Sequence, residues 1–410
     1  MIFFKSIYHY LLAWAGAIVY GFPSRKIFVL GVTGTKGKST TVELINAILE
    51  SAGKKTALSS SVRFKVDGDT EKNTSGMSMP GRLALQKFLW RAVRAGCQYA
   101  LIEVTSQGIA QHRHRFIDFD AALFTNLQPE HIEAHGSFEK YRDAKVSFFK
   151  DTAKHSRKTR KLLFVNEADQ SAEYFAASAG GGAKVVYFSR EAFIRRELGG
   201  GTESIGDWLS SNFNLENAAA ASAFVDSQGL AWPQIKKALQ AFTGVPGRLE
   251  YIQRAPFSVV IDYAHTPDSL EKVYDELFSR LGKNNKLICV LGAAGGGRDK
   301  WKWPAMGKIA SEYCDEVILT DEDPYDERPE TIINEIARGF SEPGARNKEF
   351  LKIVDRREAI AKAISLAKKG DAVIITGKGS EDWIHIARGK KIPWSEKKVV
   401  EEIIKAATSD

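Results

Sequence analysis

The chain is poor in cysteine. Only Cys97, Cys289 and Cys314 occur among its 410 residues, and they lie far apart in the sequence. An odd number of widely spaced cysteines gives no metal-ligand or disulfide pattern, so we expect a reducing compartment. Internal repeats and extended low-complexity tracts are also absent, which excludes repeat arrays and fibrous proteins.

A strong excess of one charge is also lacking. The 58 basic and 50 acidic residues give a net charge of +8, which suits small anionic substrates or an anionic membrane surface. The densest basic cluster, residues 154–161, contains no aromatic residue, so it lacks the stacking groups typical of nucleic-acid sites. We interpret this cluster as a solvated loop or helix face and expect no nucleic-acid partner.

A glycine-rich motif occupies residues 34–41 (GTKGKSTT), between the apolar run 27–32 and a helical pattern. Strand, turn and helix in this order are typical of a phosphate-binding loop, whose backbone N–H groups close on phosphate oxygens. A lysine in this loop reaches the terminal phosphates, and the following hydroxyl holds Mg²⁺. The general motif has a glycine where Val32 stands, so this is the narrower form GTxGKS. The predicted phosphate-loop residues are Gly34, Thr35, Lys36, Gly37, Lys38, Ser39 and Thr40.

Short β-type runs alternate with helical patterns throughout, which predicts α/β domains with largely parallel sheets. The segment TGVPG at residues 243–247 reads as a domain boundary. We therefore expect an apolar helix or connector at 1–26, a phosphate-loop domain at 27–243 and a Rossmann-like α/β domain at 244–410. The predicted strands are residues 27–32, 99–104, 121–125, 162–165, 184–188, 257–262, 286–291, 316–320 and 372–376.

Residues 7–22 form an apolar stretch that is short for a membrane span. With Lys5 ahead of it and small residues inside, the stretch resembles a short signal peptide. The phosphate loop follows soon afterwards, however, and an ATP site has little use outside the cell. We therefore favour a helix packed on the first domain, with a peripheral membrane contact through Trp14 and the nearby tyrosines as the alternative.

Several further residues are candidates for metal or ligand binding. Glu103 ends an apolar strand, where a carboxylate beside a phosphate loop can bind Mg²⁺. His131 and His135 are four residues apart among acids, which fits either a metal site or a polar surface loop. Asn214 and Asn217 share one helix face, where they could contact a nucleotide or cap the helix.

These motifs together resemble the Mur ligase family, the ATP-dependent peptide synthases of bacterial cell-wall precursor assembly, and within it the MurE type. The resemblance spans nearly all of residues 20–400, in the family's order. The motifs that carry it are GTKGKST, IEVTSQGI, FTNLQPEHIEAHG, Lys145, FNLEN, GRLE, DYAHTPDSLEK, GGGRDK and ITGKGSED.

The resemblance implies a role for individual residues. ATP and two Mg²⁺ ions are the implied cofactors, and Lys145 matches a carbamylated lysine whose carboxylate-like group binds metal. The implied catalytic residues are Lys38, Glu103, His131, Lys145, Arg248 and Asp262, and the metal ligands Ser39, Glu103, His131 and Lys145. Further ATP contacts are Asn214, Asn217, Arg248, Asp262 and His265. The implied substrate-binding residues are Asn73, Thr74, Thr105, Ser106, Arg113, Arg298, Asp321, Asp323, Tyr325, Gly377 and Glu381.

The chain departs from the family's pattern in three places. Only about 26 residues precede the first strand, where MurE members carry a uridine-binding domain. The uridine end of the substrate would then be left unbound, or be held by another protein or by a membrane. Enzymes adding meso-diaminopimelate carry Asp-Asn-Pro-Arg, whereas residues 321–326 read DEDPYD. Tyr325 cannot clamp a carboxylate as arginine does, and the acids suit a cationic side chain such as lysine or ornithine. The family's Gly-Lys-Gly-His-Glu reads GKGSE at 377–381.

The implied activity is ligation of an amino acid to a UDP-linked muramyl dipeptide in the cytoplasm, through an acyl phosphate. A ligase with another acceptor, similar to folylpolyglutamate synthase or to cyanophycin synthetase, is the first alternative. The second alternative is a nucleotide-binding partner subunit without ligase activity. Such a subunit would be expected to have lost Glu103, His131 or Lys145, and all three are present.

Overall fold

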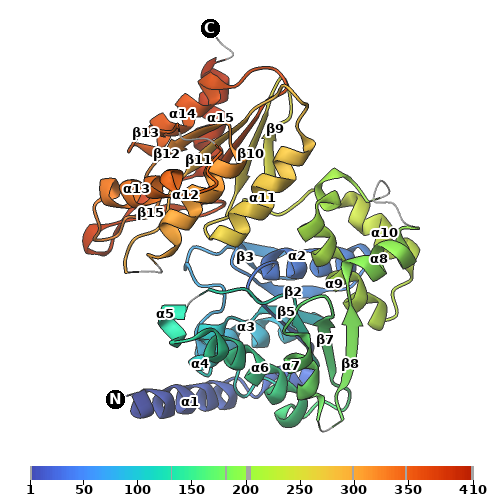
Figure 1. Ribbon diagram of the computed structural model, residues 1–410. Helices are drawn as coiled ribbons and strands as arrows, with labels where there is room; N and C mark the ends of the chain where they lie inside the picture. Colours follow the sequence, from blue (N-terminus) through green and yellow to red (C-terminus); the bar gives the residue numbers. More distant parts are fainter. Residues whose placement is uncertain are drawn as a thin grey trace. The chain divides into compact units, whose positions relative to one another are not determined.

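The computed structural model describes residues 2–130, 132–180, 182–199, 205–297, 300–346 and 349–407. The chain divides into two compact units, Met1–Thr243 and Gly244–Asp410. Each unit is built around its own β-sheet with helices packed on it (Figure 1). The α/β class with largely parallel sheets, predicted from the alternating pattern, is confirmed.

An eight-stranded sheet forms the centre of the first unit, in the order β4-β3-β2-β5-β1-β6-β7-β8. Only β3 and β4 run antiparallel to their neighbours. The parallel strands are apolar along their whole length because both faces of the sheet are covered by helices. The strands are β1 (Phe28–Thr33), β2 (Thr56–Ser59), β3 (Arg63–Val66), β4 (Asp69–Lys72), β5 (Tyr99–Glu103), β6 (Ala121–Phe124), β7 (Leu162–Asn166) and β8 (Lys184–Phe188).

The connection β1-α2-β2 moves along the sheet in one direction, and the connection β4-α3-β5 moves in the opposite direction. Because such crossovers are right-handed, α2 and α3 lie on opposite faces of the sheet. The α3 side shares one apolar core with α4, α6 and α7. The helices of the unit are α1 (Ile2–Val19), η1 (Pro23–Lys26), α2 (Lys38–Ser51), α3 (Arg82–Arg94), α4 (Ser106–Ala110), α5 (Ile132–His135), α6 (Phe138–His155), α7 (Ala172–Ala176), η2 (Ala177–Ala179), α8 (Arg190–Glu197), η3 (Asp207–Ser210), α9 (Asn212–Ser227) and α10 (Trp232–Ala241).

The predicted apolar helix at the start of the chain is present as α1. It packs on α3, on the side of that helix away from the sheet, and so forms an outer layer of the first unit (Figure 1). Ala13 and Ala17 are buried in this contact, and Leu83 of α3 lies against Gly16. Among the described helices, none combines the length and hydropathy needed to cross a membrane.

The second unit has a six-stranded sheet in the order β13-β12-β11-β14-β10-β9, of which only the edge strand β9 is antiparallel. A separate hairpin, β15 with β16, lies beside it. The strands are β9 (Glu250–Gln253), β10 (Ser258–Asp262), β11 (Leu287–Leu291), β12 (Glu316–Leu319), β13 (Leu351–Lys352), β14 (Ala372–Thr376), β15 (Trp383–Ile386) and β16 (Lys390–Pro393). The helices are α11 (Pro267–Arg280), α12 (Lys302–Tyr313), α13 (Pro329–Arg338), η4 (Gly339–Ser341), α14 (Arg356–Leu366), η5 (Ala387–Gly389) and α15 (Glu396–Ala407).

The expectation that the cysteines form no disulfide is wrong. Cys289 on β11 and Cys314 at the end of α12 are joined, with their Cα atoms 6.1 Å apart. The chain returns from α12 directly into β12, which pairs with β11, so residues 25 positions apart become neighbours. Spacing in the sequence carries no sign of this return. Cys97 is a free, buried thiol.

Candidate functional site

The predicted site residues of the first unit gather at the carboxyl ends of three adjacent strands. Val32 of β1 pairs with Glu103 at the end of β5, and Thr33 pairs with Phe124 at the end of β6. The loops that follow these strands therefore meet at one edge of the sheet, which is where parallel α/β sheets bind ligands.

Two glycines of the loop are required by their surroundings. Gly37 has φ of +82°, and a β-carbon there would collide with the side-chain oxygen of Asn217. A β-carbon at Gly34 would collide with Thr125 Oγ1. Only glycine avoids both the left-handed strain at residue 37 and these collisions. The loop is further held by hydrogen bonds from the Thr35 and Lys36 backbone N–H groups to Asn126, at 2.8 and 2.9 Å.

Three lysines converge on this loop. Lys38 Nζ and Lys145 Nζ both donate to the Gly34 carbonyl oxygen, at 3.0 and 2.7 Å. Lys36 Nζ pairs with Glu130 at 3.0 Å. Lysines at the start of a helix and beside a tight turn form a concentrated positive field, which favours a polyphosphate.

Lys145 lies inside the unit, on the face of α6 that is turned toward the loop, and its residue is 2% exposed. Burial lowers the pKa of Lys145 well below its ordinary value, and the charges of Lys38 and Lys36 lower it further, whereas Glu130 raises it. An unprotonated amine can add to CO₂ and form a carbamate, whereas an ammonium cannot. Lys145 therefore meets the chemical requirement for the carbamylation that the sequence implied.

Ser61, which is not predicted from the sequence, brings Ser39 and Glu103 together. Ser61 Oγ lies 2.8 Å from Ser39 Oγ, and Ser61 N donates to Glu103 Oε1 at 2.8 Å. A hydroxyl and a carboxylate beside a phosphate loop are the oxygen donors that Mg²⁺ takes together with phosphate. Within the described ranges, no three His, Cys, Asp or Glu side chains cluster as a metal site.

The predicted asparagines lie next to the loop. Asn217 on α9 accepts a hydrogen bond from Thr41 Oγ1 at 3.3 Å, and its side chain contacts that of Asn214 at 3.5 Å. Asn214 also donates to the Trp208 carbonyl oxygen at 2.9 Å. Both side chains are buried, and they join α9 to the first turn of α2.

The other candidates of the first unit take mainly structural contacts. Asn73 donates to the carbonyl oxygens of Ser60 and Met77 at 2.7 and 2.9 Å, and Thr105 caps α4. Ser106 Oγ lies 3.1 Å from His135 Nε2. The remaining two candidates are Arg113, which donates to the Met79 carbonyl oxygen, and Thr74, which is exposed.

Most predicted residues of the second unit lie at the ends of parallel strands or in the loops that follow them, whereas Arg248 precedes the antiparallel edge strand β9. Asp262 ends β10, and its carboxylate accepts hydrogen bonds from the backbone N–H groups of Leu249 and Ala264, both at 2.7 Å. Arg248 stacks on the ring of Tyr263 at 4.2 Å. The predicted His265 contacts the Tyr263 carbonyl oxygen through Nδ1 at 2.8 Å. Asp262 therefore fixes the backbone that presents Arg248.

A buried lysine organises the acidic loops after β12 and β14. Lys378 Nζ pairs with Asp323 at 2.8 Å and with Glu381 at 2.5 Å, and its side chain is fully buried. Burial by itself would lower the pKa of Lys378, but Glu381 and Asp323 raise it above its ordinary value. Tyr263 Oη also donates to Glu381, at 3.0 Å. Gly377 and Glu381 are predicted from the sequence, whereas Lys378 is not, although it stands in the same motif GKGSE.

The acids of residues 321–326 are largely engaged within the unit. Asp323 accepts a hydrogen bond from His385 N at 2.8 Å, and Asp326 accepts one from Arg388 N at 2.7 Å. Tyr325 has φ of +52° and stacks on the His385 ring at 5.1 Å. Asp321 Oδ1 accepts a hydrogen bond from the next backbone N–H at 2.8 Å. The candidates His131 and Arg298 lie outside the described residues.

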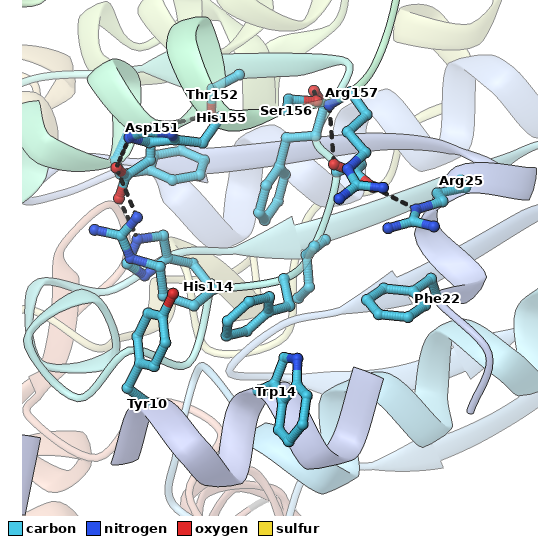
Figure 2. Close-up of a pocket in the computed structure, with 16 residues that line it drawn as sticks. Tyr10, Trp14, Phe22, Arg25, His114, Asp151, Thr152, His155, Ser156 and Arg157 are labelled. Atoms are coloured by element: carbon cyan, nitrogen blue, oxygen red, sulfur yellow. Dashed lines mark hydrogen bonds and ion pairs between the residues drawn. The ribbon is translucent and has the colours of Figure 1, made fainter. Parts of the chain in front are cut away.

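The recess drawn in Figure 2 is not at the phosphate loop. It has a volume of about 350 Å³ and is lined by residues that precede β1, β6 and β7, such as Arg25, Phe119 and Arg157, together with α1. It therefore lies at the amino edge of the sheet, opposite the edge that carries the candidate site.

Comparisons with known proteins point to the same family over most of the chain. A family model described as Mur ligase middle domain matches residues 32–225, and one described as Mur ligase, glutamate ligase domain matches residues 247–379. A UDP-N-acetylmuramoyl-L-alanyl-D-glutamate–2,6-diaminopimelate ligase of Syntrophomonas wolfei is 36% identical, over 96% of this chain and 81% of that protein. A solved structure of a ligase with the same description has a TM-score of 0.60 at 28% identity, covering 93% and 79% of the two chains. A Mycobacterium tuberculosis folylpolyglutamate synthase has a TM-score of 0.67 at 17% identity, covering 90% and 92%, and this likeness shows the fold alone.

Proposed function

This chain belongs to the Mur ligase family, and we propose that it joins an amino acid to a UDP-N-acetylmuramyl-dipeptide with consumption of ATP. The observation that carries the proposal is the group of lysines around Gly34. It is supported by Gly34 and Gly37, where any side chain would collide with Thr125 or Asn217. The cytoplasm, where ATP is available, is the proposed compartment.

The reaction has two steps. The acceptor carboxylate attacks the γ-phosphate, which gives an acyl phosphate and ADP. The amine of the amino acid then attacks the acyl carbon, and inorganic phosphate leaves as the amide bond forms. In the first step Lys38 and the loop N–H groups would stabilise charge on the phosphates, a contribution that commonly dominates phosphoryl transfer.

The proposed metal ligands are Ser39, Glu103, a carbamylated Lys145 and His131. The first three lie in the described part of the chain. Mg²⁺ bound there would neutralise phosphate charge. The carbamate proposal is supported by the burial of Lys145 and by its lowered pKa. Lys145 Nζ lies 2.7 Å from Gly34 O, so a carbamate on this side chain would adjoin the loop that is proposed to hold the phosphates.

For the amino acid, we propose a side chain that ends in an ammonium group. Asp323 and Glu381 pair with Lys378, so the loops after β12 and β14 already stabilise one ammonium at this place. The Syntrophomonas wolfei relative is a 2,6-diaminopimelate ligase. Tyr325 stands where arginine would clamp the distal carboxylate of that substrate, so we expect lysine or ornithine to be preferred.

ADP release by the purified protein tests the proposal. UDP-N-acetylmuramyl-dipeptide and Mg²⁺ are supplied with lysine, ornithine or meso-diaminopimelate singly, and turnover should require both the acceptor and one amino acid. Lys38→Ala should abolish turnover, while Lys55→Ala, an exposed lysine paired with Asp67, should not change it. Turnover with a folate-type or aspartate-rich acceptor, and none with the muramyl peptide, would favour the alternative ligases. No turnover with any acceptor would contradict the proposal.

The same assay examines the uridine end of the acceptor. The muramyl dipeptide without its nucleotide is compared with the UDP-linked form. If a partner protein holds the uridine in the cell, as the sequence analysis predicted, the purified chain should use both forms about equally well. A strong preference for the UDP-linked form would show that this chain recognises the nucleotide itself.

A further inference from the structure

The outward face of α1 is apolar, which is unusual for a helix on the surface of a folded unit. Ile7, Leu11, Trp14 and Ile18 follow the i, i+4, i+7, i+11 spacing of one helix face and are 41%, 53%, 48% and 47% exposed. Surface helices ordinarily turn polar residues outward and bury the apolar stripe. In α1 the buried contacts are made by small residues instead, and the large side chains remain exposed.

Cations predominate around this face. Neither α1 nor α3, on which it packs, contains an acidic residue, whereas α3 carries Arg82, Lys87, Arg91 and Arg94. Arg25 and Lys26, which follow α1, are exposed. Two of these cations are paired with acids from other elements, Arg25 with Asp118 at 3.1 Å and Arg91 with Asp69 at 2.8 Å. An apolar helix face bordered mainly by cations is complementary to a surface that is apolar inside and anionic at its boundary.

Aromatic residues on and beside the face fit the same surface. Tyr8 and Trp14 are exposed on α1, and Tyr20 contacts the ring of Trp90, over which Arg94 is stacked at 4.7 Å. Tryptophan and tyrosine are favoured at membrane–water interfaces because one end is apolar and the other hydrated. Exposed Leu83 of α3 extends the apolar area beyond α1.

The recess of Figure 2 opens beside the same helix. Tyr10, Trp14 and Phe22 contribute apolar surface to it, and Arg25 and Arg157 contribute cationic groups. Asp118 and Asp151 also line the recess, where Asp118 pairs with Arg25 and Asp151 with Arg115. This recess gives room for a lipid headgroup at the border of the apolar face.

We propose that α1 is an interfacial helix that lies in the plane of an anionic lipid bilayer and holds the enzyme at its surface. The outer face, defined as Ile7, Tyr8, Leu11, Trp14 and Ile18, enters the boundary between headgroups and acyl chains. The cations of α3 and of residues 25–26 contact anionic headgroups. This anchoring is independent of the proposed reaction.

Co-sedimentation of the whole chain with vesicles tests the proposal. The chain should sediment with vesicles of phosphatidylcholine and phosphatidylglycerol, and much less with phosphatidylcholine alone, and added salt should weaken the binding. The double variant Leu11→Glu/Ile18→Glu should lower the partition coefficient roughly tenfold or more, because both carboxylates would enter the apolar layer. Val354→Glu, at an exposed apolar residue of the second unit, is the matched control and should bind as the unmodified chain does.

A second measurement separates anchoring from a general loss of fold. The tryptophan emission should shift to shorter wavelength on anionic vesicles, and Trp14→Phe should bind with an unchanged partition coefficient but with a smaller shift. ADP release in solution should be the same for the double variant as for the unmodified chain. A chain that stays in the supernatant with both vesicle types would overturn the proposal, as would equal binding by the double variant. A dimer in solution that the double variant abolishes, without lipid binding, would assign the face to a second copy instead.

Discussion

At the scale of single residues, the phosphate loop depends on groups that approach it from several elements. Thr125, Asn126 and Asn217 come from loops and a helix distant in sequence, yet each contacts the backbone between Gly34 and Thr41. The conformation of the loop therefore depends on these contacts as well as on its own glycines. A small side chain added to the loop should displace the residues that contact it.

Gly37→Ala should lower ADP release roughly a hundredfold or more, because the methyl group would displace Asn217 and shift the first turn of α2. Gly53→Ala is the matched control. Gly53 also has positive φ, +74°, but nothing lies within 4 Å of a β-carbon there. That variant should lose roughly 1 kcal/mol of stability from strain and keep its activity. Equal activity of the two variants would show that the collision is unimportant.

Lys145→Ala should reduce ligation roughly a hundredfold or more, whereas Lys145→Glu should retain part of it, since glutamate restores an anion near the position of a carbamate. Equal loss in both variants would count against the carbamate. Carbon-13 NMR with labelled bicarbonate gives a readout apart from activity: a carbamate signal is expected in the unmodified chain and should be missing in Lys145→Ala.

Glu322 links protonation to stability. Burial, with a further contribution from Asp323, raises its pKa from 4.5 to about 7 although Lys378 lowers it, and among the described residues no hydrogen-bond partner faces Glu322 Oε2. The folded state holds this proton more tightly than the unfolded state, so stability falls as pH rises from about 4.5 to 7. Glu322→Gln should remove this loss, by roughly 3 kcal/mol at most at pH 8 and by little at pH 4. Thermal melts of both proteins across this range check the sign.

The residues that sequence reasoning could find are those inside recognisable motifs. Gly34 to Thr40, Glu103, Lys145 and Asn217 all meet at one sheet edge. Ser61 could not be found, because it acts through its position in space. Lys378 stands inside the motif GKGSE, but the motif does not show that its side chain is buried between two acids. Ser61 reaches the site through the turn between β2 and β3, and Lys378 is held between two loops.

At the scale of elements, α1 is bound to the first unit by its smallest residues. Gly16 lies against Leu83 and Gln86 of α3, and Ala13 is 1% exposed, whereas Leu11 is about half exposed. The attachment therefore depends on close helix approach, which tolerates no larger or charged group at the contact.

Ala13→Glu should detach α1 or lower the stability of the first unit by roughly 2 kcal/mol or more, because it places an unpaired carboxylate in the contact. Leu11→Glu should leave stability within about 0.5 kcal/mol. Hydrogen exchange of the α1 amides and thermal melts measure both effects. Similar protection of α1 in the two variants would contradict the described packing.

The elements that could be predicted are the strands buried on both faces. All nine predicted strands occur within two residues of their expected ends, because apolar runs such as FVLGVT and AVIIT leave few alternatives. The strands not predicted are β2, β3, β4, β9, β13, β15 and β16. Among them, β3 and β4 read RFKV and DTEK. They form through pairing with β2 in a meander at the sheet edge, and a short polar segment carries no sign of such a pairing.

At the scale of the whole molecule, the chain consists of two units with separate sheets and separate cores. The division at residues 243 and 244 falls inside the segment TGVPG. The second unit buries its own apolar residues between β10, β11, β12 and β14 and the helices α14 and α15. Each unit therefore has what independent folding requires.

A fragment of residues 244–410 should unfold cooperatively on its own, as measured by calorimetry and circular dichroism. It should release no ADP, because the phosphate loop is in the other unit. The pH effect of Glu322→Gln should persist in this fragment, since every group named as its cause belongs to the second unit. A fragment without a cooperative transition would show that the second unit needs the first.

The length of the central strands also determines how a charged bilayer would act on the nucleotide. Tyr10 and Trp14 of α1 line the recess at the amino edge of the sheet, whereas the phosphate loop follows the carboxyl end of β1, whose 6 residues span roughly 20 Å. The resulting distance of roughly 20 Å is about twice the Debye length at 0.1 M salt. Anionic lipid under α1 would thus exert almost no repulsion on ATP at the phosphate loop, so attachment to a negative surface need not weaken the affinity for a negative substrate.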